Sequence, residues 1–189
     1  MTSSLYPTVL TEYRYDFSEA LDTVDFLPTG FYKVADAVIK EDRYFERNPE
    51  VNPIAYQVVP GLESSYSTYK EVLYVLSIGG KVAKIGGTKV GMKGRHCSYN
   101  CGTRKARAKG TCSVTNFNLT EAQYAAIMDG ESVEWFAYDV PVVTAELNVF
   151  GETHEVKTSL FTKYEAVLLA RYKEMTGTFP ILSANSGVD

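Results

Sequence analysis

Two short apolar runs joined by a pair of glycines constrain the fold more than any other feature of this sequence. The run Glu71–Ile78 is rich in β-branched and aromatic residues, and Lys81–Gly87 has the same character after Gly79-Gly80. Two consecutive glycines supply the left-handed backbone that a tight hairpin turn requires. The pattern therefore predicts an antiparallel β-hairpin near the middle of the chain.

The segments after this hairpin alternate between helical and extended patterns. We expect a helix over residues 91–102, a basic loop over 103–112, a helix from Thr120 to Met128 opened by the capping box Thr120-x-x-Gln123, strands over 132–140 and 142–150, and a helix over 158–176 ended by Gly177 and Pro180. The order β-β-α-(α)-β-β-α predicts an α+β domain over residues 71–189, with a small sheet flanked by helices.

The first 70 residues are predicted to form an N-terminal extension. Segments 18–27 and 32–44 have helical character, and several prolines and glycines between residues 49 and 61 break the pattern into loops. No catalytic cluster stands out in this part of the chain. We expect the extension to clasp DNA or to form a dimer contact.

Composition excludes several classes of protein. With 45% hydrophobic and 22% charged residues among 189, the chain can bury a core and is not intrinsically disordered. No run approaches 18 consecutive apolar residues, and the start of the chain lacks a secretory signal pattern. The three cysteines, Cys97, Cys101 and Cys112, lack paired C-x2-C spacing, so we expect free thiols in a cytoplasmic protein, with structural zinc as the alternative.

The distribution of charge differs from its total. The net charge is −4, yet the window from Val72 to Thr120 has no Asp or Glu and nine of the chain's 19 Lys and Arg residues. The window therefore carries +9 and the rest of the chain −13. Such segregation indicates a face that binds a polyanion, or alternatively a solvated basic loop whose charges pair with acidic residues elsewhere.

We expect the polyanion to be a nucleic acid. Six or more phosphate contacts would make its binding steeply dependent on salt. The candidate DNA contacts, some of them for base edges in a groove, are Lys89, Lys93, Asn100, Arg104, Lys105, Arg107 and Lys109.

Several short motifs in this order resemble the GIY-YIG nuclease family. Val72-Leu73-Tyr74 corresponds to its first tripeptide, in which the Tyr is kept, and Lys84-Ile85-Gly86 corresponds to its second, with Lys in place of Tyr. Arg95 lies nine residues after Gly86, where the family has its Arg, and Tyr99 follows where many members have His. Glu165 matches the late helical Glu, and Asn185 follows Pro180-x-Leu182 as in the family's closing motif.

This combination of Tyr, Lys, Arg, Tyr and Glu resembles the small type II restriction endonucleases of the family. The resemblance covers residues 72–185 and implies a homodimer that cuts both strands of a short DNA site with one Mg²⁺ per active site. Two alternatives stay open. One is a non-catalytic DNA-binding module on the same scaffold, and the other is a repair or homing nuclease.

The chemistry of phosphodiester hydrolysis gives each matched residue a role. By resemblance, Tyr74 is the general base; lowering its pKa from about 10 to about 7 requires roughly 4 kcal/mol, which Lys84 and a metal-bound water are expected to supply. The Arg95 guanidinium suits the charge on the scissile phosphate, and Tyr99 shares its helical face. The alternative for each Tyr is a packing role.

Glu165 is the expected magnesium ligand. On a helical wheel it lies among Phe161, Leu169 and Tyr172, where a carboxylate is costly unless it is paired or bound to a metal. Pairing with Lys163 or Arg171 is the alternative. No second carboxylate set is evident, so one cation is expected rather than two.

The proposed site makes two geometric demands. A regular two-residue turn would pair Tyr74 with Ile85 and turn Lys84 to the opposite face, so an odd register or a β-bulge is required. The Glu165 carboxylate must also meet Tyr74, Lys84 and Arg95 around one phosphate, and its location on the far side of the sheet would contradict the hypothesis.

Overall fold

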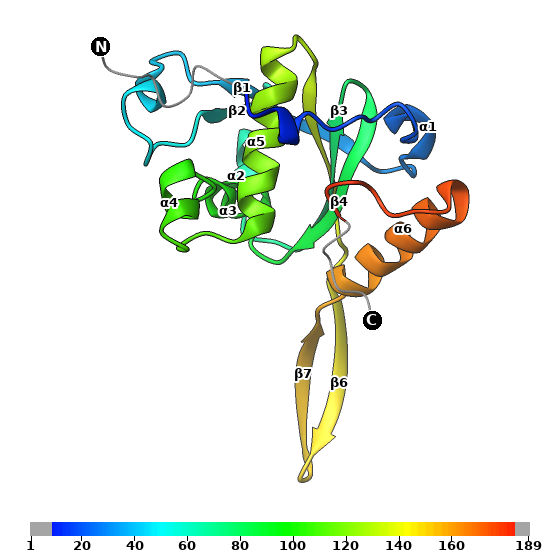
Figure 1. The fold of residues 1–189 in the computed structure, drawn as a ribbon. Helices are drawn as coiled ribbons and strands as arrows, with labels where there is room; N and C mark the ends of the chain where they lie inside the picture. Colours follow the sequence, from blue (N-terminus) through cyan, green and yellow to red (C-terminus); the bar gives the residue numbers. More distant parts are fainter. Residues whose placement is uncertain (1–8, 184–189) are drawn as a thin grey trace.

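The computed structural model describes residues 9–183 and contains a five-stranded antiparallel sheet between two layers of helices (Figure 1). The strand order is β2-β1-β5-β3-β4, so β2 and β4 form the two edges. The strands are β1 (Tyr32–Ile39), β2 (Ile54–Val58), β3 (Val72–Ile78), β4 (Lys81–Thr88) and β5 (Val133–Asp139). The predicted α+β class is confirmed.

The helices divide between the two faces of the sheet. In Figure 1, α3 and α5 lie on one side of the sheet and α6 lies on the other. The helices are α1 (Thr23–Phe26), α2 (Glu63–Ser67), α3 (Gly91–Tyr99), α4 (Arg104–Ala108), α5 (Val114–Met128) and α6 (Phe161–Thr176), with 3₁₀ turns at Thr11–Tyr13 and Tyr44–Glu46. None of the helices in residues 9–183 is both long and apolar enough to cross a membrane.

Each face of the sheet has its own hydrophobic core. The larger core contains Tyr74, Trp135 and Tyr99 together with the inner face of α5. The smaller core packs Leu168 and Tyr172 of α6 against the other face of β3 and β4. β3 is buried along its whole length because both cores cover it, which explains its continuous apolar sequence.

The predicted central hairpin is present and contains a β-bulge. Gly79 and Gly80 both have positive φ, at 57° and 77°, and Ile78 pairs with Lys81 across the turn. The register then shifts, because Ser77 pairs with Val82 but Leu76 pairs with Lys84. Directly paired residues project to the same face of a sheet, so the bulge turns Lys84 to the face of Leu76 and Tyr74. The requirement for a bulge is confirmed.

Several predicted boundaries were wrong. Residues 32–44 do not form a helix, because Val34 and Ala35 are buried in β1 between two other strands. The expected loop at 103–112 contains α4, whose N-cap is Thr103. Helix α5 begins after Ser113 rather than at Thr120, and the side chain of Gln123 accepts a hydrogen bond from the Trp135 indole at 3.1 Å instead of capping the helix.

The last predicted helix begins at Phe161 rather than at residue 158. Residues 152–158 form strand β7 (Glu152–Thr158), which pairs only with β6 (Val143–Val149) in a separate two-stranded sheet. This hairpin projects away from the rest of the molecule in Figure 1. Helix α6 ends at Gly177, whose φ of 79° is left-handed, as the sequence predicted.

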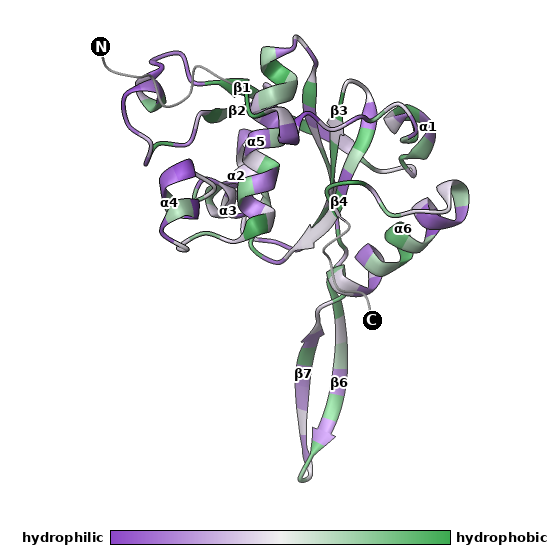
Figure 2. Cartoon of the chain, in the orientation of Figure 1, coloured by the Kyte–Doolittle hydropathy of each residue, from purple (hydrophilic) through white to green (hydrophobic). Residues whose placement is uncertain are grey.

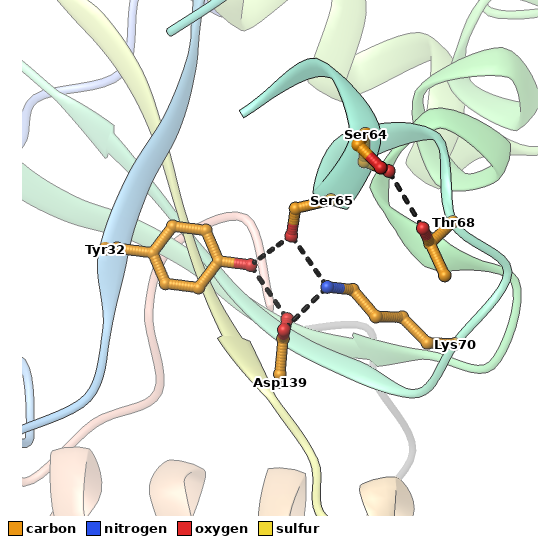
Figure 3. A network of polar contacts seen from close by, with 6 residues as sticks. All are labelled: Tyr32, Ser64, Ser65, Thr68, Lys70 and Asp139. Carbon is orange, nitrogen blue, oxygen red and sulfur yellow. Dashed lines mark hydrogen bonds and ion pairs between the residues drawn. The ribbon is translucent and has the colours of Figure 1, made fainter. Parts of the chain in front are cut away.

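A network of polar contacts fixes the point where this hairpin leaves the main sheet (Figure 3). Asp139, the last residue of β5, accepts hydrogen bonds from the Tyr32 hydroxyl at 2.8 Å and from Lys70 Nζ at 2.6 Å. Lys70 also donates to the Ser65 hydroxyl at 2.7 Å. The network thus ties together β1, the end of β5, α2 and Lys70, which lies just before β3.

A buried histidine holds α3 against the sheet. The His96 ring stacks on Tyr56 with a centroid distance of 3.7 Å and lies edge-on to Trp135 at 4.6 Å. Its Nδ1 is 2.8 Å from the Tyr66 hydroxyl. Burial lowers the pKa of His96 from 6.5 to about 3, so the ring is neutral in the folded protein.

We predict that His96 makes folding sensitive to acid. Between pH 6.5 and 3 the unfolded chain protonates this residue and the folded chain does not, so stability falls as pH falls. The loss between pH 7 and pH 4 is about 3 kcal/mol. Urea unfolding at both pH values should show a smaller loss for His96→Gln. His154→Gln, which changes an exposed histidine, should behave like the wild type; equal losses in all three proteins would contradict this assignment.

Candidate active site

Two buried phenols and one guanidinium meet where α3 crosses β3 and β4. The hydroxyls of Tyr74 and Tyr99 are 2.7 Å apart, and both side chains are almost fully buried. Arg95 Nε lies 3.1 Å from the Tyr74 oxygen and 2.9 Å from the Tyr99 oxygen. Arg95 and Tyr99 are one helical turn apart, so they share the face of α3 that points to the sheet, as predicted.

The electrostatics of Tyr74 differ from the expectation. Burial raises the pKa of Tyr74, and this effect is opposed first by the Arg95 charge and then by hydrogen bonds from Tyr99 and Arg95. The Glu165 charge raises the pKa further. Lys84 does not lower the pKa of Tyr74 as expected. The cation that contacts the Tyr74 hydroxyl is Arg95, and because the pKa of Tyr74 is raised, its side chain is a neutral phenol.

Lys84 lies on the same face of β4 and is also buried. Its Nζ donates a hydrogen bond to the backbone carbonyl of Leu182 at 2.9 Å. Burial lowers the pKa of Lys84 from 10.5 to about 8; Arg95 adds to the lowering and Glu165 opposes it. An amine with such a pKa changes its charge close to physiological pH, unlike a surface lysine.

Glycine at position 86 makes room for the Tyr74 hydroxyl. Tyr74 pairs with Gly86 across the two strands. A Cβ atom at position 86 would lie 2.2 Å from the Tyr74 oxygen. The close approach of the Tyr74 phenol to the backbone therefore depends on Gly86. This explains why the tripeptide Lys84-Ile85-Gly86 ends in glycine.

Glu165 approaches the same edge from the other side of the sheet. It lies on α6, which packs against the opposite face, and a Cβ atom at Gly87 would be 2.9 Å from its carboxylate oxygen. Burial raises the pKa of Glu165, while Lys84, Arg95 and the backbone N–H of Gly87 stabilise its charged form. No described residue forms a salt bridge with Glu165, which excludes the expected alternatives Lys163 and Arg171 in residues 9–183.

The structure shows the far-side location that was expected to contradict the hypothesis, because Glu165 lies on α6, over the sheet face opposite Tyr74, and its carboxylate comes close to the edge strand at Gly87. β4 is an edge strand, and its residues 86 and 87 carry no side chains. The charge of Glu165 acts on Tyr74, Lys84 and Arg95 around this gap, although its helix lies on the far face. The expectation that Glu165 lies on the same side of the sheet as Tyr74 was therefore wrong.

The residues present fit a single divalent cation held mainly by water and substrate. The described residues contain no group of three or more His, Cys, Asp or Glu side chains able to hold a metal. Glu165 is a half-buried carboxylate without a salt-bridge partner in the described chain. Mg²⁺ commonly uses one or two carboxylates and completes its shell with water and phosphate oxygens.

The basic window divides into paired and unpaired cations. Arg104 forms a two-pronged ion pair with the buried Glu121, at 2.9 and 2.8 Å, and Lys105 and Lys109 both contact Glu50, at 2.7 and 3.4 Å. Within residues 9–183, the cations of the window that form no salt bridge are Lys84, Lys89, Lys93, Arg95 and Arg107. Four of these five lie in β4, α3 and their connection, so the unpaired positive charge of the window is concentrated in these elements.

The remaining candidates occupy the surface near this cluster. Asn100, the C-cap of α3, is exposed, as are Lys89, Lys93 and Arg107. Cys97 and Cys101 are exposed and Cys112 is buried, all three as free thiols. Asn185 lies outside the described residues.

The sequence did not reveal the residues that hold α3, β4 and α6 in place around the site. His96, Tyr56 and Tyr66 fix α3, and Leu182 and Ser183 run along the edge of β4, where Leu182 N–H donates to the Ala83 carbonyl at 3.0 Å. Glu71 accepts hydrogen bonds from the backbone N–H groups of Leu160 and Phe161 at the start of α6.

The fold is similar to that of solved structures. The chain is similar to the restriction endonuclease HPY188I in complex with product DNA, with a TM-score of 0.58, 24% identity, and coverage of 88% of this chain and 87% of that chain. It is also similar to a mutant of bacteriophage T4 EndoII, with a TM-score of 0.50, 17% identity, and coverage of 78% and 89%. No protein-family description and no curated protein matches the sequence.

We predict that Lys84 gives stability an unusual dependence on alkaline pH. Below pH 8 the folded protein holds a buried ammonium, and between pH 8 and 10.5 it binds fewer protons than the unfolded chain, so stability rises with pH. From pH 7 to pH 10 this gain is about 2 kcal/mol.

The measurement compares urea unfolding of the wild type and Lys84→Met at both pH values. The gain should disappear in the variant, whereas Lys89→Met, at an exposed position five residues away, should keep it. An identical pH dependence in wild type and Lys84→Met would show that the ammonium is not buried.

Proposed function

We propose that this chain is a DNA endonuclease of the GIY-YIG type that hydrolyses phosphodiester bonds in double-stranded DNA. The observation that carries the proposal is the meeting of Arg95 with Tyr74 and Tyr99 beside Lys84, with the Glu165 charge acting on the same gap. The fold shared with two endonucleases supports it. The finer proposal is a sequence-specific type II restriction enzyme.

Arg95 is proposed to bind the scissile phosphate. Its Nε is held by the two tyrosine oxygens, which leaves the terminal nitrogens of the guanidinium to contact an anion. The planar fork can donate two hydrogen bonds to phosphate oxygens and stabilise the extra charge of the transition state. Lys84 in its ammonium form adds a second positive charge at the same place.

Tyr74 is proposed to accept the proton of the attacking water. Its phenolate would receive hydrogen bonds from Tyr99 and Arg95, which lower the pKa of Tyr74 against the effect of burial. Tyr99 would donate its hydroxyl proton to the phenolate and so support the charged form of Tyr74 rather than act as a base itself. The burial of both phenols excludes bulk water, which strengthens each of these interactions.

Glu165 is proposed to hold the divalent cation, most suitably Mg²⁺. When bound, the cation would polarise a phosphate oxygen and ease departure of the leaving oxygen. A carboxylate whose pKa is raised by burial gains from such a charge partner. Because Glu165 reaches the edge of β4 from the far face, it approaches the phosphate from the side opposite to the phenols.

DNA is proposed to cross the molecule beside α3. The cations there without salt bridges in the described chain, together with exposed Asn100, are suited to backbone and groove contacts. Arg104, Lys105 and Lys109 contribute less, because their charges are compensated by Glu121 and Glu50. Recognition of a palindromic site implies a two-fold homodimer.

A second candidate is a DNA-binding module without catalytic activity. The raised pKa of Tyr74 favours it, because a neutral buried phenol is a poor base. Both candidates predict salt-dependent DNA binding, so only the chemical step separates them.

We predict that Glu165→Gln abolishes cleavage and spares DNA binding. Losing the metal ligand should reduce the cleavage rate at least about 100-fold. Affinity for a DNA duplex in the absence of divalent metal should change less than about threefold, because the removed charge is not a phosphate contact. Glu174→Gln, an exposed position on the same helix, is the matched control and should cleave normally.

The decisive assay is incubation of the wild-type chain with a plasmid of mixed sequence, with and without Mg²⁺. Discrete fragments only with Mg²⁺ are expected of a site-specific restriction enzyme. A smear would replace that proposal by a non-specific nuclease. An intact plasmid, with salt-dependent binding retained, would establish the non-catalytic module.

A further inference from the structure

The segment that follows α6 turns back along the outer edge of β4 (Figure 1). After Gly177 the chain runs through the buried Pro180 to Leu182 and Ser183. Figure 2 shows hydrophobic residues in this segment, and Leu182 packs against the larger core. The Ser183 N–H donates to the Pro180 carbonyl at 2.7 Å, which closes a turn against the strand. Residues 180–183 are called the edge segment below.

The edge segment forms hydrogen bonds with three successive residues of β4. The Leu182 N–H donates to the Ala83 carbonyl at 3.0 Å, and the Leu182 carbonyl accepts from Lys84 Nζ at 2.9 Å. The Ser183 hydroxyl accepts from the Ile85 N–H at 3.0 Å and donates to the Ile85 carbonyl at 3.1 Å. These contacts hold the ammonium group of Lys84 and the backbone on both sides of this residue at once.

The first of these contacts lies at the β-bulge. Ala83 is the extra residue of the bulge, because Val82 and Lys84 both have partners in β3 and Ala83 has none. A bulge disrupts the ladder locally and leaves its extra residue unpaired. The edge segment pairs the carbonyl of this residue from the outer side. It therefore stabilises the same bulge that turns Lys84 toward Tyr74.

The Lys84 ammonium depends on the edge segment for its hydrogen bond. Lys84 is 4% exposed, and among the described residues its acceptor is the Leu182 carbonyl. Burial disfavours its charge, and Arg95 adds to this effect whereas Glu165 opposes it. A buried charge without a hydrogen-bond partner is costly, so the carbonyl stabilises the ammonium. The other titratable groups of the cluster are Tyr74 of β3, Arg95 and Tyr99 of α3, and Glu165 of α6.

Covering the strand edge does not by itself explain these contacts. Residues 21–23 cover the start of β4 with backbone hydrogen bonds to Gly80 and Val82, at 2.8 and 2.9 Å, as is common at sheet edges. The edge segment differs, because the buried Ser183 hydroxyl makes two of its contacts and the Lys84 side chain makes another. Such an arrangement fixes a side chain of the candidate site as well as the strand.

We propose that Ser183 is a positioning residue for Lys84. By bridging the N–H and the carbonyl of Ile85, its hydroxyl holds the Leu182 carbonyl in place as the acceptor of the Lys84 ammonium, which then faces the scissile phosphate beside Arg95. The inference rests on the proposed function, which assigns Lys84 to that phosphate. Without the hydroxyl, the edge segment loses two of its contacts with β4, and the carbonyl that holds the ammonium is no longer fixed.

The test follows the charge of Lys84 by NMR in the full chain labelled with ¹³C at the lysine Cε atoms. The Lys84 signal is identified by its absence from Lys84→Met. Ser183→Ala should lower the pH at which this signal titrates by at least about half a pH unit, because the ammonium loses a well-placed acceptor. Ser77→Ala is the matched control, since it removes another buried serine hydrogen bond from the same hairpin, and it should leave the titration unchanged.

The same titration in the wild type and Ser183→Ala would overturn the proposal, and so would an equal change in Ser77→Ala. If Ser183→Ala fails to fold by circular dichroism, Ser183→Cys replaces it. Its thiol forms weaker hydrogen bonds than a hydroxyl, so the titration should change in the same direction.

Activity separates this proposal from the proposed function. At equal amounts of folded protein, Ser183→Ala should cleave DNA at least about tenfold more slowly than Ser77→Ala, because a displaced ammonium stabilises the transition state less. A wild type that cleaves no DNA, with the expected change in Lys84 titration, would overturn the endonuclease and leave the positioning of Lys84 intact. A wild type that cleaves DNA, with Ser183→Ala as active as Ser77→Ala, would overturn the positioning role and leave the endonuclease intact.

Discussion

The contact of Arg95 with the hydroxyls of Tyr74 and Tyr99 is the interaction on which the rest of the site depends. Two buried phenols are costly unless their oxygens are paired, and one guanidinium nitrogen pairs both. For this to happen, α3 must lie at a fixed height above β3, which the stacking of His96 on Tyr56 secures. The support behind the helix is therefore as important as the residues that face the substrate.

Edge position explains how two sheet faces contribute to one site. A central strand would separate the phenols above the sheet from the carboxylate below it. At β4, which has no neighbouring strand on its outer side, the two consecutive glycines leave only backbone between them. The Gly87 backbone contacts the carboxylate, and Gly86 accommodates the phenol, so a pair of missing side chains brings the two halves within electrostatic reach.

The uneven charge of the chain has two different uses in the structure. Arg104 and Lys105 form ion pairs with Glu121 and Glu50, and these contacts hold α4 to its surroundings. Lys84 of β4 and Lys93 and Arg95 of α3 form no salt bridge in the described residues, and Arg95 contacts both phenols. The two sequence interpretations, a polyanion-binding face and a compensated basic loop, thus apply to different parts of the same window.

The sequence by itself determined the central hairpin and the C-terminal helix, because each depends on local spacing, and its motifs in a fixed order indicated five candidate site residues. It did not reveal β1, β2 or β7, since strand formation there depends on partners distant in the chain. Only the tertiary structure decided that a bulge turns Lys84 toward Tyr74, that Arg95 rather than Lys84 contacts the phenol, and that Glu165 arrives from the opposite face. These features arise from register and packing, which no single segment encodes.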